Sequence, residues 1–196
     1  SLAACEYGGD KGIFGYGYTG GVVSMTNLVS NAGVVATDVT GVGTARQYLA
    51  ACEYGGDKGI FGYGNDGVHV SMTNLVSNVG VVATDVTGVG TARSAPAACG
   101  YGEDKGIFGY GNNGSNVNVS NLVSNAGVVG TDVSGVGTAR ESLGACEYGT
   151  DKGIFGYGYV SGGVSMTNLV SNAGVVATDV TGVGSDRYGV AACSFN

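Results

Sequence analysis

The strongest constraint on this chain is an internal repeat with a step of 47 residues. The segment DKGIFGYG begins at Asp10 and returns at Asp57, Asp104 and Asp151, with no insertion or deletion between the copies. The five cysteines keep the same step. Because every repeat has the same sequence on both sides, we expect every repeat to have the same neighbours in space, as in a ring or a stack.

The repeat divides the chain into four units and a short remainder. We predict a single domain over residues 1–196. Its units run approximately over 2–48, 49–95, 96–142 and 143–189. The remainder, 190–196, restarts the pattern of the first strand and is a surplus copy of it. This surplus strand has three interpretations: it closes a ring in place of the N-terminal strand, it contacts another chain in a homo-oligomer, or the chain is part of a longer array.

Each unit has the pattern of short strands separated by tight turns. In the first unit we predict strands over residues 2–7, 13–16, 22–30 and 34–39. They are rich in β-branched and aromatic residues, and the segments GGDK and NAG between them are typical turns. No segment keeps the 3.6-residue period of a helix. The high glycine content, 40 residues, fits many turns and close strand contacts rather than collagen, whose strict period is not found here.

Four short antiparallel strands in each 47-residue unit are typical of a propeller blade. The sequence therefore predicts an all-β fold: a four-bladed β-propeller with four-stranded antiparallel blades. The alternative is a β-solenoid, which also tolerates glycine-rich strands. Solenoids need distinct end caps, whereas the end units here resemble the middle units, and this favours a ring.

The segment from TAR through LAACEYGGDKGIFGYG resembles a kelch repeat in the order of its features. The matching residues of one copy are Thr44-Ala45-Arg46, Ala50-Ala51-Cys52, Gly55-Gly56, Ile60-Phe61-Gly62, Gly64, Asn74-Leu75-Val76 and Thr84-Asp85. The chain departs from the family in having Gly-Tyr-Gly for the Gly-Gly doublet and no tryptophan. The chain is also similar to repetitive propeller-like proteins of phages and aquatic microbes, and its size resembles that of hemopexin-like propellers. The resemblance implies a propeller and leaves the ligand open.

The copies differ from one another in two segments of each unit. One segment follows FGYG and the other follows the TAR-type arginine, and in a propeller blade both connections lie on the same side of the ring. Variation on one side predicts a polar and aromatic binding rim on a rigid scaffold. Its residues are Tyr18, Asn65, Asp66, His69, Asn112, Asn113, Asn116 and Tyr159. The alternative is that these Asn-Gly and Asp-Gly steps are only hairpin turns.

Four arginines occupy the same position in successive units. They are Arg46, Arg93, Arg140 and Arg187. As a ring near the pore they would bind an anion. The structural alternative is that each bridges two blades through backbone carbonyls or through the repeated carboxylates that begin with Asp38.

The sequence holds no strong signal for catalysis or metal binding. The cysteines are 47 residues apart, so none forms a zinc-binding CxxC pair, and we read them as small buried groups. A disulfide between Cys5 and Cys193 is the sharper alternative, because both lie on terminal copies of the first strand. The only histidine, His69, has no nucleophile motif beside it. We expect no catalytic residue, no metal and no cofactor.

The charge pattern restricts the partners. The formal net charge is −7, and all eight basic residues fall at two repeated positions, so no basic cluster forms along the sequence. Nucleic acid and anionic membrane surfaces are therefore not expected partners. We expect a non-catalytic module, extracellular or on a virion surface, that binds a glycan or a protein. The alternative is a purely structural virion or surface repeat protein without a soluble ligand.

Overall fold

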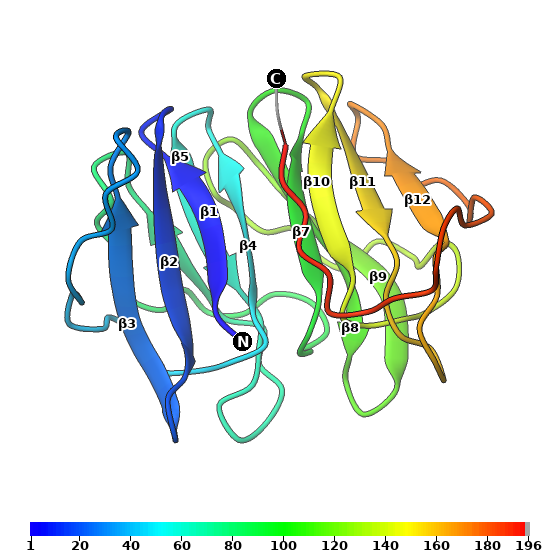
Figure 1. Ribbon diagram of the computed structural model, residues 1–196, viewed down its shortest axis with the longest axis horizontal. Helices are drawn as coiled ribbons and strands as arrows, with labels where there is room; N and C mark the ends of the chain where they lie inside the picture. Colours follow the sequence, from blue (N-terminus) through cyan, green and yellow to red (C-terminus); the bar gives the residue numbers. More distant parts are fainter. Residues whose placement is uncertain (195–196) are drawn as a thin grey trace.

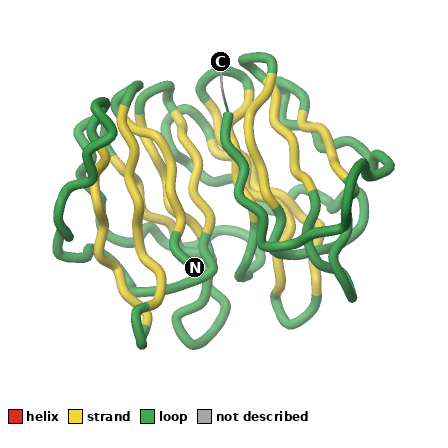
Figure 2. Tube along the Cα trace, viewed as in Figure 1, coloured by secondary structure: helices red, strands yellow, loops and turns green. Residues whose placement is uncertain are grey.

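The computed structural model describes residues 1–194, and in this range the chain is all-β, without a helix. Its strands form four three-stranded antiparallel sheets, one from each unit (Figure 2). We number the sheets 1 to 4 in chain order. In each sheet the strands are ordered as in the sequence, so that every connection is a hairpin between neighbours.

The strand bounds repeat with the 47-residue step. In sheet 1 the strands are β1 (Ala3–Tyr7), β2 (Lys11–Tyr18) and β3 (Val22–Val29). In sheet 2 they are β4 (Ala50–Tyr54), β5 (Lys58–Gly62) and β6 (Thr73–Val76). In sheet 3 they are β7 (Ala97–Tyr101), β8 (Lys105–Asn112) and β9 (Asn116–Val123). In sheet 4 they are β10 (Gly144–Tyr148), β11 (Lys152–Gly156) and β12 (Thr167–Val170).

The predicted fourth strand of each unit makes only two isolated bridges. In sheet 1, Val39 pairs with Thr26 and Val35 pairs with Val29, which leaves one extra residue on the outer segment. The side chain of Asn27 also donates a hydrogen bond to the carbonyl of Ala36, at 3.1 Å. An extra residue and a side chain in the ladder both interrupt regular pairing. The outer segment therefore follows the sheet without forming a strand.

The four sheets stand side by side as an open arc (Figure 1). The first strands, β1, β4, β7 and β10, are the inner strands, and each contacts the next along the arc. A single cavity of about 660 Å³ is lined by residues of all four. The predicted closed ring is not formed, because sheets 1 and 4 stay apart and leave an opening, seen at the front of Figure 1.

The predicted surplus strand lies in this opening. Residues 190–194 run along β10, and the hydroxyl of Ser194 accepts a hydrogen bond from the amide of Glu147 at 2.8 Å. The segment is not a strand, since each inner strand pairs only with the second strand of its own unit and the tail has no such partner among the described residues. Phe195 and Asn196, also predicted in this strand, lie outside the described residues.

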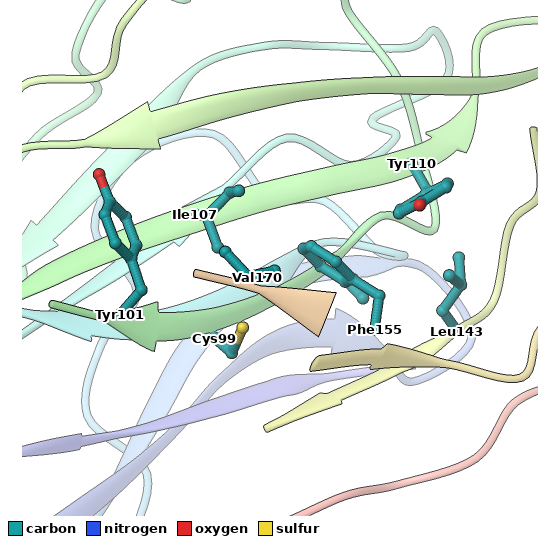
Figure 3. Packing of buried hydrophobic residues seen from close by; sticks show 8 residues of the cluster. Cys99, Tyr101, Ile107, Tyr110, Leu143, Phe155 and Val170 are labelled. Carbon is teal, nitrogen blue, oxygen red and sulfur yellow. The ribbon is translucent and has the colours of Figure 1, made fainter. Parts of the chain in front are cut away.

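The hydrophobic core lies between the sheets, and we call each contact between neighbouring sheets a joint. Three joints are formed, each with its own buried cluster. Figure 3 shows the cluster between sheets 3 and 4, where Phe155 of sheet 4 points toward Tyr110 of sheet 3. The two rings meet edge to face with their centroids 5.3 Å apart.

A glycine makes each joint possible. A Cβ atom placed on Gly109 would lie 2.7 Å from the ring of Phe155, and Gly15 and Gly62 make the same close approach to Phe61 and Phe108. The glycine inside the second strand therefore acts as a socket for the phenylalanine of the next sheet.

Candidate functional site

The two variable segments of the repeat meet at one end of the sheets. The segments after Arg46, Arg93 and Arg140 each form an isolated bridge with the hairpin between the second and third strands of the next sheet. The bridged pairs are Gln47 with Asn65, Ser94 with Asn112, and Glu141 with Tyr159. We call this edge the variable rim. The backbone pairing brings together segments that lie far apart within the repeat, as the sequence analysis predicted for a blade.

The turns that are nearly the same in all four units meet at the opposite end. In every sheet an asparagine in the turn after the third strand donates a hydrogen bond to the aspartate in the turn between the first and second strands. The pairs are Asn31 with Asp10, Asn78 with Asp57, Asn125 with Asp104, and Asn172 with Asp151. The segments that vary most among the copies therefore lie at one end of the sheets, and the turns that vary least lie at the other.

The predicted rim residues of sheets 1 and 2 differ in exposure. Tyr18 is exposed at the end of β2, in the hairpin that leads to β3. Asn65 and Asp66 are half-buried, and each accepts a backbone hydrogen bond two residues ahead. His69 is half-buried too, and its Nδ1 atom has no hydrogen-bond partner among the described residues. Of these four side chains, Tyr18 is the most accessible to a ligand.

The rim residues of sheets 3 and 4 contact one another. The side chain of Asn116 accepts a hydrogen bond from Asn112 and donates one to the carbonyl of Tyr159, at 3.2 and 3.0 Å. Asn113 is exposed at the hairpin tip. Tyr159 packs edge to face against Tyr188, which is 60 % exposed and was not predicted. The structure therefore joins these residues into one polar and aromatic ridge.

A chain of backbone hydrogen bonds runs along the rim beside the inner strands. The amide of Ala95 donates to the carbonyl of Tyr48, Ser142 donates to Ala95, and Gly189 donates to Ser142. Each of these positions has a positive φ, which is strained for Tyr48, Ala95 and Ser142. Sequence reasoning did not find this chain. The four positions are 47 residues apart, and the last of them is Gly189, a residue type that favours a positive φ.

The repeated arginines bridge neighbouring sheets. Arg46 is fully buried and donates from Nε to the carbonyl of Tyr63 at 2.8 Å and from Nη2 to the side chain of Asn74 at 2.7 Å. Its guanidinium also lies over the ring of Tyr16, 4.3 Å from the centroid. Burial lowers the pKa of Arg46, and the nearby Tyr16 opposes this change. These contacts match the bridging role and leave no surface for an anion.

The next two arginines are buried in the same way, and the last one, in sheet 4, is not. Arg93 and Arg140 are also fully buried, each over a tyrosine of its own sheet. Arg140 adds the bonds to Tyr157 and Asn168, whereas Nε and Nη2 of Arg93 have no partner among the described residues. Arg187 is exposed, because no sheet follows it. Only this arginine remains accessible to an anion.

The repeated aspartates also cross the joints. Asp85 of sheet 2 accepts hydrogen bonds from the amide and the hydroxyl of Thr44, at 3.0 and 2.7 Å, and one from Asn74. Burial raises the pKa of Asp85, but these hydrogen bonds outweigh burial, and the pKa lies below its ordinary value. Asp132 and Asp179 make the same contacts at the next two joints. These side chains hold the sheets together.

The alternative of a disulfide between Cys5 and Cys193 is not formed, since all five cysteines are free thiols. The sulfur of Cys5 points into the first joint, where it lies 2.6 Å from the place of a Cβ on Gly59. Burial raises the pKa of Cys5 to about 12, so the thiol stays neutral. Cys193 is exposed on the tail. The two sulfurs belong to different surroundings, because the arc stays open.

The central cavity has an acidic lining. Glu6, Glu53 and Glu147 face it from three inner strands, and Gly100 takes the equivalent place on the fourth. The side chain of Glu147 lies over Gly100, where a side chain would clash with it. Burial first, and then the charges of Glu53 and Glu6, raise the pKa of Glu147 to about 7. A negatively charged carboxylate disfavours the ionisation of a carboxyl group close to it, and this is the effect of Glu53 and Glu6 on Glu147.

Two further features of residues 1–194 concern metal binding and membrane crossing. In this range no group of three or more His, Cys, Asp or Glu side chains is arranged to hold a metal ion. The same range has no helix with the length and apolar character that crossing a membrane requires. Comparison with protein-family models and with curated proteins found no match for this chain.

Proposed function

We propose that this chain is a non-catalytic recognition module of the β-propeller type, with kelch-like blades, that binds a glycan or a protein through the variable rim. Each unit would be one blade, with the outer segment as its fourth strand. Antiparallel sheets gathered around one cavity support this architecture over a solenoid of stacked coils.

The observation that carries the proposal is the pairing of the two variable segments at one end of the sheets. A binding surface needs variation that the scaffold tolerates, and here the copies differ at the rim while the glycine, phenylalanine and arginine of the joints recur in every unit. The rim offers Tyr, Asn and Ser side chains, which combine rigid aromatic area with adaptable hydrogen bonding. Tyr18 and Tyr188 are its most exposed aromatic residues, at 55 % and 60 %.

A second candidate is a structural surface protein, and a different observation favours it. The most exposed valine of each outer segment lies at the same position in every unit. These are Val34, Val81, Val128 and Val175, and each is more than 60 % exposed. Repeated apolar side chains on an edge segment favour contacts between copies. Under this proposal the chain packs into a virion or cell-surface layer without a soluble ligand; both candidates suit an extracellular or virion-surface setting.

The test is a binding array that carries free glycans and glycosylated surface proteins, the latter before and after enzymatic removal of the sugar. We expect binding that weakens at least tenfold in the variant Tyr18→Ser. The matched control is Lys11→Ala, which changes the opposite end of the same sheet and is expected to bind like the parent.

The outcomes separate the proposals. Binding to free glycans, or loss of binding after removal of the sugar, identifies a glycan. Binding that survives removal identifies a protein. No binding on the whole array, together with self-association that Val34→Ser and Val81→Ser weaken, supports the structural candidate instead. Equal losses in Tyr18→Ser and Lys11→Ala would contradict recognition by the rim.

A further inference from the structure

The two ends of the arc are the two halves of one joint. In each formed joint, one sheet contributes a glycine socket, a tyrosine and an arginine, and the next contributes a phenylalanine, an asparagine and an aspartate. Because the order is head to tail, sheet 4 ends with an open first half and sheet 1 begins with an open second half.

Sheet 4 presents the empty socket. A Cβ on Gly156 would meet only a methyl group of Thr167, at 3.4 Å, whereas the three corresponding glycines are each filled by a phenylalanine. A pocket of about 280 Å³ lies here, lined by Gly156, Tyr157, Arg187 and the tail. Arg187 already lies over the ring of Tyr157, 4.6 Å from its centroid, in the pose of the buried arginines. The socket is thus preformed.

Sheet 1 presents the matching side chains. Phe14 is 39 % exposed, while its equivalents Phe61, Phe108 and Phe155 are completely buried. Asp38 accepts a hydrogen bond only from Asn27 among the described residues, whereas its equivalent Asp85 is also clasped by Thr44. These groups face the opening without the partners that they have elsewhere in the arc.

The cavity shows how many units surround it. Its lining takes three consecutive residues from each inner strand and the same three from the tail. These are residues 4–6, 51–53, 98–100, 145–147 and 192–194. The tail therefore occupies the inner-strand position of a fifth sheet, between β10 and β1.

We propose that the opening is a docking site for the second, third and outer segments of one further 47-residue unit of this same sequence, which would complete a five-membered ring. The phenylalanine of that unit would fill the socket at Gly156, and its own socket would receive Phe14. Its terminal arginine would bridge to Asn27. This inference rests on the propeller architecture proposed above, but not on any ligand of the rim.

The experiment extends the chain. Residues 1–194 are followed directly by a copy of residues 54–94, which continues the repeat in register and adds no cysteine. Cys193 is exposed in the arc, while its equivalents Cys52 and Cys99 are buried. We expect the extension to slow the labelling of the Cys193 thiol at least 100-fold and to raise Tm by about 10 °C, since it forms two joints at once.

Two variants of the extended chain act as controls. Ala in place of the appended copy of Phe61 empties the socket again, and it should restore fast labelling of Cys193. Phe14→Ala should lower Tm strongly in the extended chain and only slightly in the parent. A longer chain with a second added unit should be trimmed by protease to the length of the five-unit chain.

Other outcomes would overturn the inference. An unchanged labelling rate and Tm in the extended chain would mean that the opening does not accept the unit. A six-unit chain that resists protease along its whole length would mean a larger ring. A parent chain that is a dimer in solution with Cys193 protected would mean that a second copy fills the opening. None of these results depends on binding by the rim, which the array tests separately.

Discussion

Sheets 1 and 2 have nearly the same sequence and the same hairpins, but they differ in their neighbours. Phe61 of sheet 2 is completely buried against Gly15 and Tyr16 of sheet 1. The equivalent Phe14 of sheet 1 has no preceding sheet and is 39 % exposed. At the other end of the arc, Tyr157 of sheet 4 is less buried than its equivalents in sheets 1 to 3, because no sheet follows it.

This difference teaches that the stability of the chain lies in the joints and not in the single sheets. A three-stranded sheet with strands of four to eight residues has little core of its own. In repeat proteins the free energy is approximately a sum over units and over contacts between nearest neighbours. Equivalent substitutions at a filled joint and at an open end should therefore differ in their effect, and four predictions measure that difference.

The largest effect is expected for the buried phenylalanine. Phe61→Ala should lower the free energy of unfolding by about 4 kcal/mol, because it empties a fully packed socket. Phe14→Ala removes a half-exposed ring and should cost less than about 1 kcal/mol. Urea denaturation followed by tyrosine fluorescence measures both values. Equal losses would show that the joints contribute no more than the ends.

The arginine pair should give the next largest difference. Arg46→Ala leaves the carbonyl of Tyr63 and the side chain of Asn74 without their donor inside a joint, and should cost about 3 kcal/mol. Arg187→Ala removes an exposed side chain and should change stability by less than about 1 kcal/mol. Thermal unfolding of the two variants tests this. Arg46→Lys should not restore the parent, because lysine cannot form both bonds in the same plane.

Alanine at the socket glycines should give a smaller difference in stability. At the open end the substitution can even be stabilising. A methyl group on Gly62 would lie 2.7 Å from the ring of Phe108, so Gly62→Ala should cost about 2 kcal/mol. Gly156 has no ring against it, and Gly156→Ala should be neutral or stabilise by about 0.5 kcal/mol. Midpoints of urea unfolding compare the two. A large loss in Gly156→Ala would argue against an open socket.

The smallest effect is expected from the carboxylates of the cavity. The pKa of Glu147 is raised from 4.5 to about 7, so the folded chain holds a proton that the unfolded chain releases. The stability from this group is complete below pH 4.5 and is lost as the pH rises toward 7. Glu147→Gln should flatten this fall, as measured by Tm between pH 4.5 and 8. Glu6→Gln, at an exposed position of sheet 1, should flatten it less.

Much of the local structure could be predicted from the sequence. In the first unit, for which bounds were predicted, the first three strands lie within two residues of those bounds. The bridging role of the arginines and the separation of the variable and invariant connections also follow from the repeat. The fourth strand could not be predicted correctly, because an apolar pattern does not show that Asn27 takes the carbonyl of Ala36 out of the ladder.

The candidate site was predictable in its position and only partly in its contacts. Variation among the copies located the rim, but the packing of Tyr188 on Tyr159 joins residues that no sequence pattern pairs. The strained backbone chain through Tyr48, Ala95 and Ser142 was also missed, because these three residue types do not indicate a positive φ and only the glycine at the equivalent position, Gly189, does.

By itself the sequence determined the repeat, the hairpins and the groups that hold one unit to the next, because these depend on residues at fixed spacing. Only the tertiary structure decided that the four sheets form an open arc with a socket at one end and a matching side chain at the other. The reason is that curvature accumulates from small rotations between neighbouring sheets. The same residues recur in every unit, so no residue pattern records how far those rotations carry the arc around.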